Sequence, residues 1–282
     1  LRRKGVISSI ESADLTALGY STAIAVLREC TMPEDIRRRL AALHCTYRLL
    51  QPVTEPNTII AVLLASRKAL SEIRSNLEKM EKDIIKNLTF MYITRSWSKA
   101  TNANPASPWE AVALISKWLH HQAQPEPASR PESIAQDKFS RKVIEELTLS
   151  GKVSAHKLRE KTGGGYTTFS RRLYEMRSKR IIVRRGTLTG IALGDPYFII
   201  VKTPLREAHK VAWAILSTCS GIIHEVNGDI TGAAGLIYLR PSTYPNIAKA
   251  LSIIFSRNLK ALWLLTEAAG GTLNIPSANT AK

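Results

Sequence analysis

Short hydroxyl side chains and a dense run of cations lie together between residues 167 and 185. Threonine and serine are short enough to approach base edges in the major groove, and arginine donates paired hydrogen bonds to guanine or phosphate. We therefore predict that this segment binds double-stranded DNA. The predicted base-reading residues are Thr167, Thr168, Ser170 and Arg171, and the predicted backbone contacts are Arg172, Arg177, Lys179, Arg180, Arg184 and Arg185. Tyr174 either joins them or packs against a neighbouring domain.

The distribution of the net charge of +17 supports this prediction. Residues 137–186 hold 14 Lys and Arg against 5 Asp and Glu, a net charge of +9 in a short stretch. Cations clustered in this way neutralise phosphates and release condensed counterions. A DNA-organising or segregation protein that binds with little sequence preference is an open alternative, because the charge permits it equally.

Predicted helices and strands over 137–192 would hold these side chains in place. They are a helix over 137–150, a short helix from Ser154 to Lys161, a helix over 167–179, and strands over 181–185 and 187–192 around Gly186. The third helix buries Phe169, Leu173 and Met176, which follow the helical repeat and leave the polar residues on the opposite side. This order is that of a winged helix-turn-helix, whose last helix enters the major groove.

The sections on either side of this unit show the same order of signals. The first has predicted strands over 22–29, 47–53, 58–65 and 88–94 and helices over 33–43 and 70–80. The second has predicted strands over 197–202, 222–226, 235–239 and 261–265 and helices over 207–218 and 246–257. Both orders are βαββαβ. The predicted fold class is therefore α+β, with two ferredoxin-like domains and a winged helix-turn-helix between them.

A constant offset of 175 residues relates the two sections. Ala17-Leu18-Gly19 recurs as Ala192-Leu193-Gly194, and residues 1–10 fall on 176–185. We therefore predict a tandem duplication. The predicted layout is a sensor or dimerisation domain over 1–99, a helix and Pro-rich linker over 100–136, the DNA-binding domain over 137–192, a second ferredoxin-like domain over 193–270, and a tail over 271–282.

The segment KTGGGYTTFSRRLYEMRSKRIIV resembles the helix-turn-helix of the Lrp/AsnC transcriptional regulators. The residues that fall in register are Phe169, Arg172, Leu173, Met176, Ile181 and Ile182. The resemblance extends over most of the chain, except for residues 100–136 and the tail. It implies a cytoplasmic regulator that assembles through its ferredoxin-like domains, as a homo-oligomer or as a pseudo-dimer within one chain. Because residue 1 aligns with a wing, it also implies a further helix-turn-helix upstream.

The resemblance further implies a small-molecule effector site in the turn between the middle strands. The family tends to show a Gly-x-x-Asp turn there; the second section keeps Gly228-Asp229, which a plain β-turn explains equally well, and the first has Glu55-Pro56-Asn57, which does not match. Arg159 and Gly164 also depart from the family, because these positions usually hold a small and an apolar residue.

Enzymatic activity is the main rival hypothesis. The histidines next to Cys45 and near Cys219 have no acidic neighbour in a triad or metal-ligand spacing, and no phosphate-binding glycine loop is present. We therefore expect no enzyme, no cofactor, no metal site and no membrane association. One enzyme branch, the siroheme decarboxylases, resembles the same architecture, so a decarboxylase of this type is the alternative.

Overall fold

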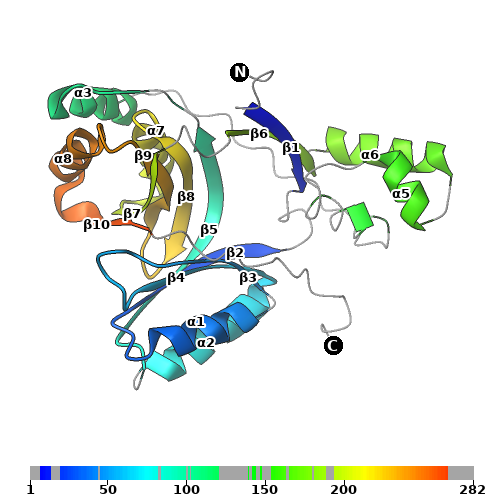
Figure 1. Cartoon of the computed structure of the whole chain (residues 1–282), viewed down its shortest axis with the longest axis horizontal. Coiled ribbons are helices and arrows are strands. Elements are labelled where there is room, and N and C mark those ends of the chain that lie inside the picture. The colour runs from blue at the N-terminus through cyan, green and yellow to red at the C-terminus, as the bar shows by residue number, and fades with distance from the viewer. Residues whose placement is uncertain are drawn as a thin grey trace. The chain divides into compact units, whose positions relative to one another are not determined.

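The computed structural model describes residues 7–13, 20–43, 45–81, 84–99, 101, 103–120, 139, 142–143, 147, 154–162, 165–179, 181–188 and 194–265 (Figure 1). The chain divides into two compact units. The first unit contains residues 1–21, 127–189 and 275–282, and the second contains residues 22–126 and 190–274. Each unit is described by itself below.

The second unit contains two halves with the predicted βαββαβ order. The first half comprises β2 (Ser21–Arg28), α1 (Pro33–Ala42), β3 (Thr46–Leu50), β4 (Ile59–Ala65), α2 (Arg67–Glu81) and β5 (Asn87–Lys99). The second half comprises β7 (Asp195–Lys202), α7 (Leu205–Leu216), β8 (Ser220–Gly228), β9 (Gly232–Leu239), α8 (Tyr244–Phe255), a 3-10 turn η3 (Ser256–Asn258) and β10 (Leu259–Leu264).

The two halves share one eight-stranded sheet of order β10-β7-β9-β8-β5-β2-β4-β3. They join where β5 pairs antiparallel with β8, from Met91 opposite Gly228 to Lys99 opposite Gly221. A bridge between Pro52 and Leu265 links the segments that follow β3 and β10, at the two ends of the sheet. The halves are therefore not separate domains, because each covers the open strand edge of the other.

Three apolar clusters hold this unit together. One lies between the sheet and α1 and α2, and another lies between the sheet and α7 and α8. Figure 1 shows these helix pairs against their own halves. The third cluster lines the other face of the sheet and draws on both halves, with Ile24 and Met91 from the first and Phe198 and Val226 from the second. This shared cluster ties the halves into one core.

Helix α3 (Pro108–Leu119) belongs to the second half rather than to a free linker. Ala111 and Ile115 are fully buried in the cluster around α7 and α8. Ser107 caps the helix by accepting a hydrogen bond from the Glu110 amide, and the Glu110 carboxylate accepts one from the Ala106 amide. This reciprocal capping fixes where the helix begins.

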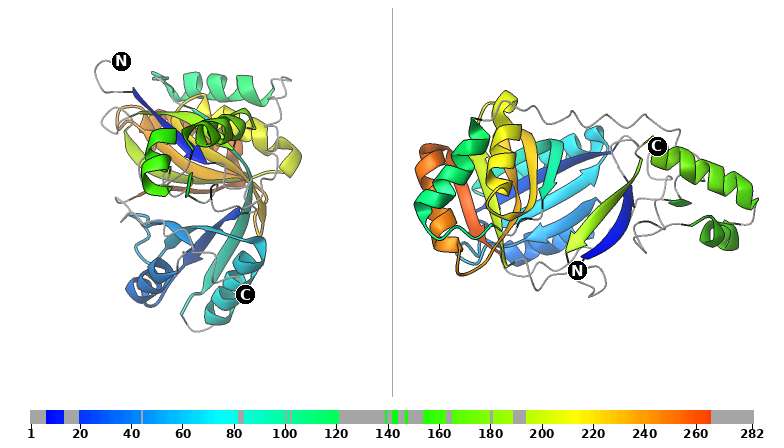
Figure 2. Two further views of the ribbon diagram at one scale, coloured as in Figure 1. Left: turned by 90° about the vertical axis from the view of Figure 1, so that its right-hand side faces the viewer. Right: turned by 90° about the horizontal axis from the view of Figure 1, so that it is seen from above.

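The first unit holds α5 (Ala155–Thr162), α6 (Tyr166–Ser178), β1 (Ile7–Ala13) and β6 (Ile182–Leu188). Its core includes Leu158 of α5 and Leu173 and Met176 of α6. The predicted hairpin around Gly186 is wrong, because Gly186 lies inside the single strand β6. That strand pairs antiparallel with β1, from 175 residues earlier, and the two lie side by side in Figure 2. Residues 189–193, where a second wing strand was predicted, lie outside the described residues.

Candidate functional site

An uncovered part of the sheet carries the histidine best placed for chemistry. Ser96 of β5 and Ala234 of β9 lie opposite His224 of β8, and Leu236 lies opposite Ile222. Ala234 belongs to the cluster that both halves share, and Leu236 packs against it. Ser96, Ile222 and His224 therefore lie on the face of the sheet that carries this cluster. Here the face is open: Ile222 is 40% exposed and the Ser96 side chain is exposed. We call Ser96, Ser98, Ile222, His224 and Leu236 the open face.

The length of β5 creates the open face. β2 pairs with β5 only as far as Ala23 opposite Tyr92, whereas β5 continues to Lys99 along β8. The register shifts between Ile93 and Arg95, and the Thr94 hydroxyl there donates to the Glu225 carbonyl at 3.1 Å. Such a bulge re-aims the side chains that follow it. The part of β5 beyond Tyr92 therefore lacks β2 as a neighbour.

A hydrogen bond orients the imidazole of His224. Its Nδ1 lies 2.8 Å from the Ser96 hydroxyl, across the β5–β8 pair. On the opposite face of the same strands, the Trp97 indole donates to the buried Glu225 carboxylate at 2.8 Å. This second bond holds the register of β5 on β8. A fixed imidazole that is open to solvent can accept or donate a proton to a bound molecule.

The cysteines do not offer a thiolate beside this histidine. Burial raises the pKa of the Cys219 thiol to about 12 and that of Cys30 to about 11. It also raises the pKa of Cys45 above its ordinary value. A thiol whose pKa lies well above neutrality stays protonated, and the protonated form is a poor nucleophile. The cysteines are therefore poor candidates for a nucleophile in this part of the sheet.

The predicted DNA-binding residues lie mainly on α6. Exposed side chains are those of Thr167, Thr168, Arg171, Tyr174, Arg177 and Lys179. Tyr174 is 72% exposed, so it does not pack into a core. Ser170 is half-buried. The buried Leu173 and Met176 hold the opposite side of the helix against α5.

Three of the predicted phosphate contacts have other surroundings. The Arg172 guanidinium is half-buried and lies 5.2 Å from the ring centre of Phe139. Arg184 and Arg185 lie in β6, where their backbones pair with Glu11 and Ile10. Arg180 lies outside the described residues. The described contact of the Arg172 side chain is thus with the ring of Phe139, which packs against the core of this unit.

Gly228 and Asp229, the predicted effector residues, lie where the β8–β9 turn meets the first half. One Asp229 carboxylate oxygen accepts from Arg74 at 2.8 Å, and the other accepts from the Phe90 amide at 2.7 Å. Gly228 has a φ of 156°, and a Cβ there would lie 2.4 Å from the Phe90 carbonyl oxygen. The turn therefore fastens the two halves together.

Replacing Asp229 with alanine should lower the free energy of unfolding by about 1.5–3 kcal/mol, as expected for hydrogen bonds that involve a charged group. Asp229→Asn is the matched control. It keeps an oxygen that accepts the hydrogen bond of the Phe90 amide, so it should lower the free energy of unfolding less than Asp229→Ala does. Urea unfolding of the three proteins measures both values. Equal stability of Asp229→Ala and the parent would show that the turn does not fasten the halves.

No helix in the described part of the chain combines the length and apolar character that crossing a bilayer requires. No protein-family model and no curated protein matches the sequence. Among solved structures, the chain is similar to siroheme decarboxylase NirDL in complex with an iron-uroporphyrin III analogue, at 11% identity and a TM-score of 0.51. A second structure of siroheme decarboxylase NirDL matches at 12% identity and a TM-score of 0.51. Each match covers 94% of this chain and 78% of the other.

These matches correct one expectation from the sequence. We expected no enzyme, because no triad, metal spacing or phosphate loop is present in the sequence. Both matching structures are of an enzyme, so that expectation is contradicted. His224, the histidine near Cys219, has no acidic neighbour in the sequence, and only strand pairing brings it beside Ser96. The chain has the Lrp-like fold of these decarboxylase structures, with two ferredoxin-like halves in one sheet.

Proposed function

We propose that the protein is an enzyme of the siroheme decarboxylase type, which binds a carboxylated tetrapyrrole against the open face. The observation that carries this proposal is the half-buried His224, oriented by Ser96, on a fold shared with such an enzyme. Ile222 and Leu236 flank the imidazole with apolar surface. A flat macrocycle can bury its own apolar surface against such side chains.

The proposed chemistry needs one proton donor. When a carboxylate leaves as carbon dioxide, its bonding electron pair stays on the neighbouring carbon, and that carbon must take up a proton. The His224 imidazole supplies the proton and regains it from water. Ser96 is a positioning residue, because its hydroxyl lies at 2.8 Å from His224 Nδ1 and orients the imidazole ring. The step requires no oxidant.

The open face fits only part of such a substrate. Its five residues offer two hydroxyls, one imidazole and two aliphatic side chains, and none is an arginine or lysine. The carboxylates of the substrate would therefore need cations from elsewhere in the chain. Binding is best tested before turnover: titration with iron-uroporphyrin III should shift its absorbance band, and His224→Ala should weaken the titration while His209→Ala leaves it unchanged. No shift at all, or equal loss in both variants, would contradict the proposal.

We propose DNA binding by α6 as a second function, because one specific observation favours it. Arg171, Tyr174 and Arg177 lie at helical spacing and are exposed, on a helix whose other side is buried. The exposure of either arginine, taken alone, is explained by an ordinary solvated helix face. The exposed tyrosine between them has no such simple explanation, because burying an aromatic ring is favourable. A negatively charged duplex would cover all three residues at once.

Replacing Arg171 or Arg177 with alanine should weaken duplex binding and lower the slope of log affinity against log salt by about 1 each, because one phosphate contact is lost. Fluorescence anisotropy over a range of salt concentrations measures both quantities. Lys249→Ala, an exposed α8 variant in the other unit, is the control. Unchanged affinity of both arginine variants would rule out α6 as the DNA-binding element.

We also infer that the chain is a pseudo-dimer made by duplication. Ile10 of β1 pairs with Arg185 of β6, and the two positions are themselves 175 residues apart. Pairing between equivalent positions is what a local twofold axis produces. Since the halves also cover each other's sheet edges, light scattering should give the mass of one chain at micromolar concentration. A dimer mass would show that assembly needs a second copy.

A further inference from the structure

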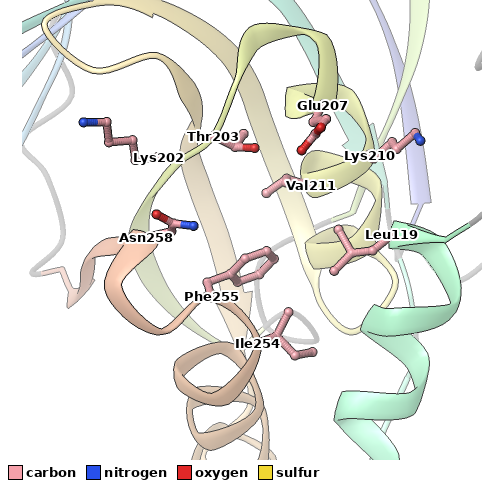
Figure 3. A pocket seen from close by; sticks show the side chains of 9 residues that line it. All are labelled: Leu119, Lys202, Thr203, Glu207, Lys210, Val211, Ile254, Phe255 and Asn258. Carbon is pink, nitrogen blue, oxygen red and sulfur yellow. The ribbon is translucent and has the colours of Figure 1, made fainter.

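A cavity of about 370 Å³ lies among α3, α7 and α8, in the second half of the large sheet (Figure 3). None of its lining residues belongs to the open face, and none was singled out as a candidate site from the sequence. Its volume is within the range of small-molecule sites in proteins.

One wall of the cavity is apolar. Leu119 comes from α3, Val211 from α7, and Ile254 and Phe255 from α8. Val211 and Phe255 are buried members of the core, so they form a fixed floor. Leu119 and Ile254 are only partly buried and pack against the same core. An apolar ligand body of a few carbon atoms would bury the remaining surface.

The other wall is polar, with an excess of cations at the rim. Thr203, Glu207 and Asn258 surround the centre of the cavity in Figure 3, whereas Lys202 and Lys210 lie on opposite sides of it, with their ammonium groups pointing outwards. Among the described residues, neither Lys202 nor Lys210 forms an ion pair. The Glu207 carboxylate, in contrast, lies 3.7 Å from the guanidinium of Arg206. Two unpaired ammonium groups and a net charge of +17 both favour an anion.

We propose that this cavity binds a small monocarboxylate with an apolar body. The body lies on the wall formed by Val211, Ile254 and Phe255. The carboxylate lies at the rim on the side of Lys202 and Asn258, away from Glu207, where the flexible side chain of Lys202 can turn to reach it. The Thr203 hydroxyl and the Asn258 amide hydrogen-bond any polar group between the two ends.

Three probes with one apolar body test the head-group preference: phenylpropionate, phenylpropanol and phenylpropylamine. Ligand-observed NMR on the full chain should show binding in the order carboxylate, alcohol, amine. Stronger binding of the amine would place Glu207 rather than the lysines at the head group and overturn the proposal. Equal binding of all three would show that no charge is recognised and would also overturn it.

Variants test the location. The double variant Lys202→Gln/Lys210→Gln should weaken phenylpropionate binding by about two- to five-fold, as expected for the loss of one solvent-exposed ion pair. Ile254→Trp should fill the cavity and abolish binding. Lys249→Gln on the same helix, outside the cavity, should bind as the parent does. Thermal melting confirms that each variant is folded. Unchanged binding in both the double variant and Ile254→Trp would place the ligand elsewhere.

Discussion

Replacing His224 with alanine is expected to lower the rate of tetrapyrrole decarboxylation by about 10²- to 10⁴-fold, the usual contribution of a positioned general acid. The imidazole is the proton donor of the proposed step, and its Nδ1 is held by Ser96 at 2.8 Å. Single-turnover assays with saturating substrate separate this loss from weakened binding. Ser96→Ala should lower the rate much less, because it removes the hydrogen bond that orients the imidazole and keeps the imidazole itself.

Two controls make this experiment decisive. His209→Ala removes a half-buried histidine from α7 and should leave the rate unchanged. The far-UV spectrum and melting temperature of His224→Ala should match those of the parent, because the side chain is partly open to solvent. A rate for His224→Ala within a few-fold of the parent would remove His224 from the chemistry.

Replacing Phe198 with alanine should lower the free energy of unfolding by about 3–5 kcal/mol, as deletion of a buried aromatic ring does. Phe198 is only 2% exposed and lies in the cluster that both halves share. The loss of the Phe198 ring should lower the urea midpoint of both halves together, because both halves contribute side chains to this cluster. Urea unfolding followed by tryptophan fluorescence and by circular dichroism measures the effect.

Ile253→Ala on α8 is the matched control. Ile253 is 40% exposed, so its removal should change the free energy of unfolding by less than about 0.5 kcal/mol. Coincident transitions from the two probes would show that the halves unfold as one. Separate transitions for the two halves would contradict a shared core.

The order of elements in the large unit followed from the sequence, because strand and helix periodicities differ. The predicted helix over 33–43 is observed as Pro33–Ala42, and the predicted strand over 58–65 as Ile59–Ala65. The pairing of β5 with β8 could not be predicted from the sequence. Partner choice between strands depends on contacts distant in sequence, and no local pattern near Lys99 records its partner.

The open face was missed for the same reason. The strand predicted to end at Thr94 continues to Lys99, and only that extension brings Ser96 to His224. Single hydroxyl and imidazole residues some 128 positions apart carry no spacing signal. The short alternation Ser96-Trp97-Ser98 was a hint that the strand continues, since in a strand Ser96 and Ser98 share a face while Trp97 takes the other.

The segment predicted to bind DNA shows the opposite balance, because its helix was predicted closely and the pairing of its strand was not. Helix α6 covers Tyr166–Ser178, within one residue of the predicted helix over 167–179. The predicted turn at Gly186 is wrong, because β6 continues through Gly186, which pairs with Ser9 of β1. Helices are specified locally, whereas β6 is specified by a strand 175 residues away.

The most direct measurement of the central proposal is the mass of the tetrapyrrole after incubation with the purified full chain. Siroheme should lose the mass of carbon dioxide, in one or more steps, in the presence of the parent protein, and should stay intact with His224→Ala. Binding without any loss of mass by the parent, under conditions where a known siroheme decarboxylase is active, would contradict decarboxylation as the function of this fold here.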